Sequence, residues 1–176
     1  MTVTNVTADA VVTIAWLSTA DTTLVVPVYQ RQYRWRVDEC ERLLSDLRAV
    51  ARAGAGQTHF LGSILHTSAA SGEDTEWMLV DGQQRVTTLM LLIAAIRDTL
   101  AGTDEAISGA LHRILQHPTR AGQTRLRLRN DAERELADIV FGRSIPEVNV
   151  ETSQPQEKYE FFLREIRDDA LSVWSG

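Results

Sequence analysis

The residues with the clearest capacity for chemistry stand together in one run, Asp81-Gly82-Gln83-Gln84-Arg85-Val86-Thr87-Thr88. An apolar segment typical of a strand precedes the run, and apolar residues at helical spacing follow it. A helix N-terminus presents unpaired backbone N–H groups and a partial positive charge, which together bind anions. Glycine permits a sharp turn and a close approach of a ligand, while arginine grips a phosphate with two hydrogen bonds. The two threonine hydroxyls add donors, so the run predicts a phosphate-binding site.

A second interpretation of the same run stays open. Asp-Gly is a common turn, and Gln-Gln-Arg is also typical of the solvated first turn of a helix. Under the functional interpretation, Asp81 would hold a hydrated Mg²⁺ or position a water molecule.

The run PVYQRQYRWR, from Pro27 to Arg36, interleaves three arginines with two tyrosines and a tryptophan. This pattern suits a phosphate grip combined with stacking on a base or sugar. The alternative is a loop whose aromatic rings pack on the core while its arginines stay in solvent. The residues alone do not separate these two interpretations.

Three segments in order, VPVYQRQYRW, HFLGSIL and MLVDGQQRVTTLMLLIAAIRD, carry a family resemblance. They resemble the DGQQR-motif domain at the N-terminus of GmrSD-type modification-dependent restriction enzymes, and in particular the SspE-type effectors that sense phosphorothioate-modified DNA. The resemblance is close over residues 24–100 and looser through RLRLRNDAERELADI and QEKYEFFLREI. It implies an α+β fold with a ParB/sulfiredoxin-like core, a small mixed sheet with helices, followed by a mainly helical extension.

The resemblance also implies a function. The chain would bind and hydrolyse a nucleoside triphosphate, GTP in particular, with Mg²⁺, and would sense modified double-stranded DNA. It would control an HNH-type nuclease, which we expect outside this chain because the four histidines form no HNH or HExxH signature. The alternative is a ParB-like, nucleotide-gated DNA-binding switch with little or no hydrolysis.

The residues expected to act fall into three groups. Those expected in catalysis are Asp81, also as a metal ligand, Gln83, Gln84 and Arg85. Those expected to bind nucleotide are Gly82, Arg85, Thr87, Thr88, Gln30 and Arg31. Those expected to contact DNA or its modification are Pro27, Val28, Tyr29, Gln30, Arg31, Arg34, Trp35 and His59.

Composition and residue spacing argue against several other classes of function. A net charge of −6 argues against a domain that coats DNA by charge alone. One cysteine and four scattered histidines lack the spacing of a zinc site, and Lys158 lies in a glycine-free segment, which excludes a P-loop. No apolar run is long enough to span a bilayer, so we expect a cytoplasmic protein without membrane contact; a homo-oligomer stays open. The arginines of residues 120–134 predict either a DNA-facing patch or, with more support, a surface paired with nearby carboxylates.

The elements that must position these residues follow from periodicity. Strands are expected at 24–28, 60–67, 77–80 and 125–129, and helices at 37–51, 86–100, 104–116, 130–140 and 156–171. Residues 1–20 are ambiguous between strand and helix, and residues 68–76 are expected as a hairpin loop. Pro27 suggests an edge strand or a strand end. Cys40 is expected to be buried, and the domain division is expected to be a nucleotide-binding core at 1–102 and a helical extension at 103–176.

Overall fold

The computed structural model describes residues 7–19, 22–29, 33–54, 56–71, 74–128, 132–143 and 154–174. Its helices are α1 (Thr13–Leu17), α2 (Val37–Ala53), α3 (Gln83–Leu100), α4 (Glu105–Leu115), α5 (Ala132–Val140) and α6 (Gln154–Trp174). Its strands are β1 (Thr22–Val25), β2 (Leu65–Ser71), β3 (Asp74–Asp81) and β4 (Leu126–Arg127). The expected α+β class is confirmed.

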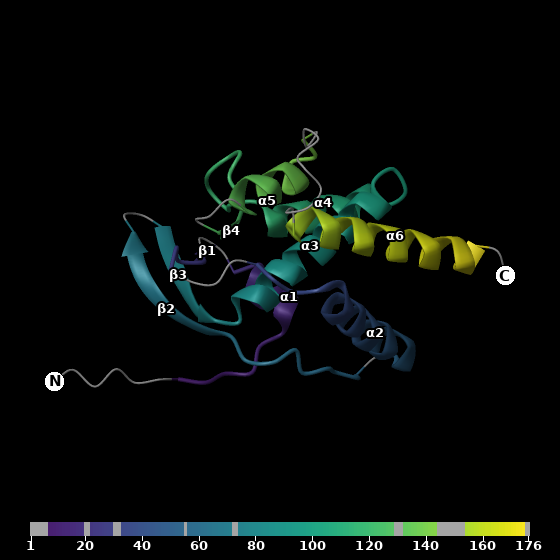
Figure 1. Cartoon of the computed structure of the whole chain (residues 1–176), viewed down its shortest axis with the longest axis horizontal. Helices are drawn as coiled ribbons and strands as arrows, with labels where there is room; N and C mark the ends of the chain where they lie inside the picture. Colours follow the sequence, from purple (N-terminus) through teal and green to yellow (C-terminus); the bar gives the residue numbers. More distant parts are fainter. Residues whose placement is uncertain are drawn as a thin grey trace.

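The four strands form one mixed sheet in the order β2-β3-β1-β4. β2 and β3 pair antiparallel as a hairpin, whereas β1 lies parallel to both β3 and β4. The sheet stands at one end of the molecule and the helices α2, α4 and α6 at the other, with α3 running between them (Figure 1). Because β3 leads directly into α3, the Asp81-Gly82 junction lies where the sheet meets the helices.

α3 is the central helix of the core. We expected it to bury one face, but every residue from Val86 to Ala95 is buried. A helix that is apolar on all sides belongs in a core rather than on a surface. α6 packs along α3, and both helices contribute to one hydrophobic cluster together with the sheet.

The hairpin differs from the expectation. The strand expected at 60–67 is β2, which begins only at Leu65, and β2 and β3 extend through most of the region expected as a loop. Cross-strand pairing extends β2 through Ser68 and Ala69, residues with little strand preference of their own. β1 is an interior strand that ends at Val25, so Pro27 follows a strand end and does not mark an edge.

The other helices begin and end close to their expected bounds. α2 begins after Arg36, whose backbone N–H donates to Glu39 Oε2 at 2.6 Å, and it ends before Gly54. Asp104 caps α4 by accepting from the Ile107 N–H at 3.0 Å. The ambiguous N-terminal stretch contains the short helix α1, and Cys40 is buried as expected. Residues 130 and 131, at the start of the helix expected at 130–140, lie outside the described residues.

Residues on both sides of position 102 share one core. β4 extends the sheet beside β1, and Arg97 of α3 donates from Nη2 to the Ile139 carbonyl at the end of α5 at 3.0 Å. No gap in the described core marks a domain boundary at residue 102, so the expected division there stays a prediction. Within the described ranges, we find no helix whose length and hydropathy would suit a membrane span.

Candidate functional site

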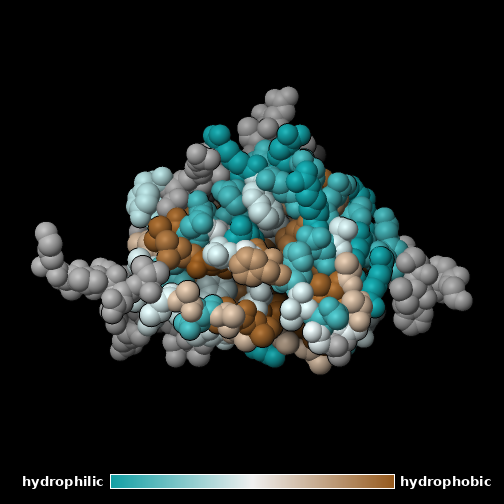
Figure 2. Space-filling view, turned by 90° about the horizontal axis from the view of Figure 1, so that it is seen from below, coloured by the Kyte–Doolittle hydropathy of each residue, from teal (hydrophilic) through white to brown (hydrophobic). Residues whose placement is uncertain are grey.

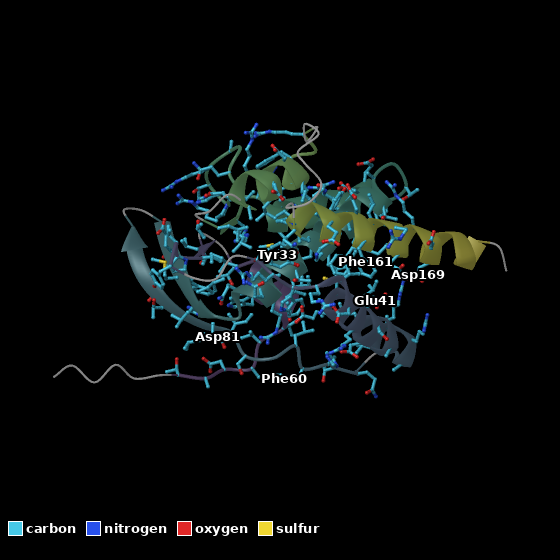
Figure 3. All side chains as sticks on the ribbon, in the orientation of Figure 1. Tyr33, Glu41, Phe60, Asp81, Phe161 and Asp169 are labelled. Carbon is cyan, nitrogen blue, oxygen red and sulfur yellow. The ribbon has the colours of Figure 1, made fainter. Side chains whose placement is uncertain are left out.

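Three chain segments meet at the N-terminus of α3. The first is the β3–α3 junction at residues 81–85, the second is the segment 56–64 that leads into β2, and the third is the segment 33–36 that leads into α2. The segment 56–64 runs along the lower side of the molecule in Figure 1, and Phe60 and Asp81 both lie toward that side (Figure 3). Seen from that side, hydrophobic areas are interleaved with polar ones (Figure 2).

Gly82 is the N-cap of α3 in the left-handed conformation, with φ 86° and ψ 4°. A Cβ there would lie 3.1 Å from Ile64 Cγ1 and 3.2 Å from the Ser63 carbonyl oxygen. The close approach predicted for a ligand is therefore made by the chain's own backbone at Ser63 and Ile64, and Gly82 itself is buried. Gly82 contributes to the site by allowing the segment 56–64 to pack against the start of α3.

Arg85 is half-buried in the first turn of α3. Its Nη1 donates to the Ser63 carbonyl oxygen at 2.7 Å, and its guanidinium lies against Gly62. Among the described residues no carboxylate forms an ion pair with it. A neutral carbonyl orients the guanidinium without cancelling its charge, and the positive end of the α3 dipole adds to that charge. The combination favours an anion at this position.

Gln84 connects this junction to the arginine-rich run. Its Oε1 accepts the backbone N–H of Arg34 at 2.7 Å. Gln83 and Gln84 are half-buried and the Arg34 side chain is exposed. The two motifs, whose contacting residues Arg34 and Gln84 are 50 positions apart in the sequence, are thus in direct contact.

Tyr33 and Thr88 make a second contact between the motifs. Tyr33 Oη and Thr88 Oγ1 lie 2.8 Å apart in the core. Thr87 and Thr88 are 2% and 0% exposed, and their hydroxyls donate to the carbonyls of Gln83 and Gln84 at 2.8 and 2.9 Å. Neither hydroxyl is open to a ligand in this structure, so the nucleotide contacts expected of Thr87 and Thr88 are corrected to structural ones.

The other residues of the run from Pro27 to Arg36 differ in how far they are exposed to solvent. Pro27 is buried and offers no surface to DNA, which corrects that expectation. Val28 and Tyr29 are 71% and 81% exposed, and Trp35 is half-buried against the core. Gln30 and Arg31 lie outside the described residues.

His59 lies in the segment before β2. Its imidazole Nε2 lies 3.3 Å from Asp46 Oδ2 of α2, and both side chains are exposed. His66 lies on β2, stacked on Trp77 at 4.4 Å between ring centroids. Within the described residues, no hydrogen bond or ion pair joins His59 to Val28 or Tyr29, and its expected role at DNA stays a prediction.

Asp81, the expected metal ligand, ends β3 with an exposed side chain. No group of three His, Cys, Asp or Glu residues suited to a metal ion occurs in the described part of the chain. Mg²⁺ in nucleotide sites commonly takes one or two carboxylates and completes its shell with phosphate oxygens and water. A single carboxylate beside a phosphate site fits that pattern.

The arginines of residues 120–134 do not form one free patch. Arg125 is buried, where Nε donates to the Ile114 carbonyl and Nη1 to the Thr19 carbonyl at 2.9 and 2.8 Å. Arg127 pairs with Glu76 at 3.3 Å, and Arg134 lies 4.0 Å from Asp138. The paired surface was thus the better prediction for Arg127 and Arg134, while the burial of Arg125 was not foreseen. Arg129 lies outside the described residues.

Sequence reasoning missed Gly62, Ser63 and Tyr33 as members of the site. Ser63 contributes only its backbone carbonyl, which leaves no trace in side-chain chemistry. Gly62 has φ 96°, and the glycine in HFLGSIL, between Leu61 and Ser63, was the one available signal of a close approach. Tyr33 belongs to the arginine-rich run, and its burial agrees with the alternative in which aromatic rings of that run pack on the core.

The comparison with protein families gives one match. The model of the GmrSD restriction endonuclease N-terminal domain matches residues 15–172, a span that includes all three segments of the site. No curated protein matches the chain. Because the family model covers most of the chain, the protein belongs to the family of GmrSD restriction endonuclease N-terminal domains, and it is an effector domain of a restriction system.

Proposed function

We propose that this domain binds a nucleoside triphosphate, GTP in particular, with the phosphates against Arg85 and the N-terminus of α3. The observation that carries the proposal is the state of Arg85. It is oriented by the Ser63 carbonyl at 2.7 Å, and no described carboxylate neutralises it. Arg48, by contrast, pairs with Glu165 and Asp169. Arg125 donates to carbonyls as Arg85 does, but it is buried, whereas Arg85 is partly exposed at a helix N-terminus. An oriented, unneutralised guanidinium is suited to a phosphate.

Hydrolysis would use the polar residues around the same helix start. Phosphoryl transfer depends on positioning and charge neutralisation, which Arg85 supplies through its guanidinium. Gln83 and Gln84 precede Arg85 in the same turn of α3 and would orient a water molecule. Asp81 would hold Mg²⁺ together with the phosphates. The bound metal would add Lewis-acid stabilisation of the developing charge.

DNA would be read by the neighbouring loop. The family is one of restriction endonucleases, so DNA is the expected partner and a nuclease of the same system is the expected target of control. Val28 and Tyr29 present exposed apolar surface, and Arg34 presents an exposed charge. A phosphorothioate is larger and a weaker hydrogen-bond acceptor than a phosphate, so apolar surface favours it while arginine binds the flanking phosphates.

A second function is favoured by the bond between Gln84 Oε1 and the Arg34 N–H. Through that bond, Gln84 in the first turn of α3 connects the proposed phosphate site to the proposed DNA-binding loop. A nucleotide-gated DNA-binding switch with little hydrolysis, as in ParB-like proteins, would use the same connection. Both functions need the same phosphate site and differ in turnover.

The test compares wild type with Arg85→Ala in nucleotide binding and in phosphate release, with Mg²⁺ and with or without modified duplex. Loss of one charge-assisted contact should weaken binding by about 1.5–3 kcal/mol, roughly 10- to 150-fold. Arg113→Ala, an exposed arginine on α4, is the matched control and should bind as wild type. Phosphate release by wild type supports the enzyme, and binding without release supports the switch. Equal nucleotide affinity of wild type and Arg85→Ala contradicts both.

A further inference from the structure

The backbone at Gly62 and Ser63 holds the guanidinium of Arg85 in one place. A Cβ built on Gly62 would lie 2.7 Å from Arg85 Cζ, 2.9 Å from Nη1 and 3.0 Å from Nη2. The next residue accepts from Nη1 through its carbonyl, Ser63 O, at 2.7 Å. The plane of the guanidinium therefore lies against a glycine, with one corner fixed by a backbone oxygen.

Glycine is needed at position 62 for two separate reasons. Its φ of 96° lies in the left-handed region that other residues avoid, and the guanidinium fills the space that a side chain would occupy. Gly56, in the same segment, allows the effect of the backbone conformation to be distinguished from the effect of the contact with Arg85. It has φ 95°, but nothing lies within 4 Å of a Cβ built there. A substitution would thus strain the backbone at both glycines, but at Gly62 the new side chain would also collide with Arg85.

We propose that Gly62 and the Ser63 carbonyl are positioning residues that preset Arg85 to receive two oxygens of one phosphoryl group. This inference rests on the proposed nucleotide site. With Nη1 bonded to Ser63 O, the edge formed by Nε–H and Nη2–H has no partner among the described residues. These two parallel N–H donors match two oxygens of a phosphate in a bidentate contact.

Presetting matters because arginine is a flexible side chain. Holding the Arg85 side chain in one rotamer has an entropic cost. Contacts formed on folding offset that cost before a ligand arrives, so ligand binding does not have to offset it. The Ser63 carbonyl serves this purpose without lowering the positive charge, which a carboxylate in its place would do. The segment HFLGSIL thus takes part in the site through its backbone.

The experiment compares Gly62→Ala with Gly56→Ala in two measurements. The first is the ¹⁵N-edited spectrum of the arginine side chains without any ligand, with the Arg85 signal assigned by its loss in Arg85→Lys. A held guanidinium gives resolved Nη signals from slowed rotation, and an exposed one such as Arg36 gives merged signals. The second is the affinity for a fluorescent, non-hydrolysable GTP analogue with Mg²⁺.

We expect resolved Arg85 signals in wild type and Gly56→Ala, and merged signals in Gly62→Ala. Affinity should fall roughly tenfold in Gly62→Ala and less than about twofold in Gly56→Ala. In the Arg85→Ala background, Gly62→Ala should cause no further loss, because its effect acts through Arg85. Equal losses in the two glycine variants, or a full additional loss in the Arg85→Ala background, would overturn the proposal.

Two results separate this inference from the function on which it rests. If wild type binds no nucleotide, the proposed function fails, while resolved Nη signals still support the positioning of Arg85. If Gly62→Ala does not fold, the wild-type spectrum decides alone, and merged Arg85 signals, like those of Arg36, would overturn the positioning role.

Discussion

Tyr33 Oη and Thr88 Oγ1 form a buried hydrogen bond of 2.8 Å between the two motifs that the sequence singles out. Thr88 donates its own proton to the Gln84 carbonyl at 2.9 Å, so Tyr33 is the donor in this bond. Burial raises the pKa of Tyr33 far above its usual range, which keeps the phenol protonated and able to donate. The bond fixes the segment before α2 against the first turns of α3.

Removing this bond should destabilise the domain. Tyr33→Phe keeps the ring and leaves the Thr88 oxygen without its donor, so the free energy of unfolding should fall by about 1 kcal/mol. Tyr29→Phe is the matched control, because Tyr29 is 81% exposed, and it should leave stability unchanged. Urea denaturation followed by tryptophan fluorescence measures both. Equal stability of Tyr33→Phe and wild type would show that the bond contributes nothing net.

Cys40, the single cysteine, should be protected from thiol reagents in the native protein. It is fully buried, and burial raises the pKa of its thiol to about 11. Because the thiolate is the reactive species, little reaction is expected with a disulfide reagent at about pH 8. Denaturant should release a full equivalent of reactive thiol. Rapid labelling under native conditions would contradict the packing of α2.

Acid should weaken the fold in part through His66. Burial lowers the pKa of His66 below its ordinary value of 6.5, and its Nδ1 has no hydrogen-bond partner among the described residues. As pH falls below about 6.5, the unfolded chain takes up a proton before the folded chain does, so stability declines with falling pH. His66→Phe keeps a ring to stack on Trp77 and removes the titration. Its stability should decline less than that of wild type between about pH 7.5 and about pH 5.5, whereas parallel declines would exclude a contribution from His66.

Arg97 should be among the most sensitive positions of the helical part. It is buried, pairs with Asp98 at 2.7 Å and donates to the carbonyls of Ile139 and Val140 at the end of α5. Arg97→Met would remove the Arg97 donors from both carbonyls, of which Ile139 would keep the Gly142 N–H at 3.4 Å, and would leave Asp98 without its cation. We expect a loss of about 3 kcal/mol or more in the free energy of unfolding. Arg113→Met, at an exposed position, should change little in the same denaturation experiment.

Local patterns were sufficient to predict the helices α2 to α6 and the strand–helix junction of the site, but not the short helix α1. α2 and α4 carry apolar residues at helical spacing, with Gly54 after the end of α2 and Asp104 as the cap at the start of α4. β2 was placed too early because its second half, rich in Ser and Ala, is a strand only through pairing with β3. Preference for strand depends on the neighbouring strand more than on the residue itself.

Contacts between distant segments could not be predicted in the same way. Arg85 was identified as the central residue, but the acceptor that holds it is a backbone carbonyl, which any residue possesses. Thr87 and Thr88 were assigned to a ligand because of their hydroxyls. In a buried helix such hydroxyls bond to carbonyls one turn earlier, and burial of α3 on all sides is a tertiary effect.

The most direct test of the central claim is a crystal structure of the domain with Mg²⁺ and a non-hydrolysable GTP analogue. We predict that a phosphate group lies at the N-terminus of α3, with two of its oxygens within hydrogen-bond distance of Arg85 Nε and Nη2. The bond from Nη1 to Ser63 O should be retained. Phosphates bound elsewhere on the domain, with Arg85 making no contact to them, would contradict the account.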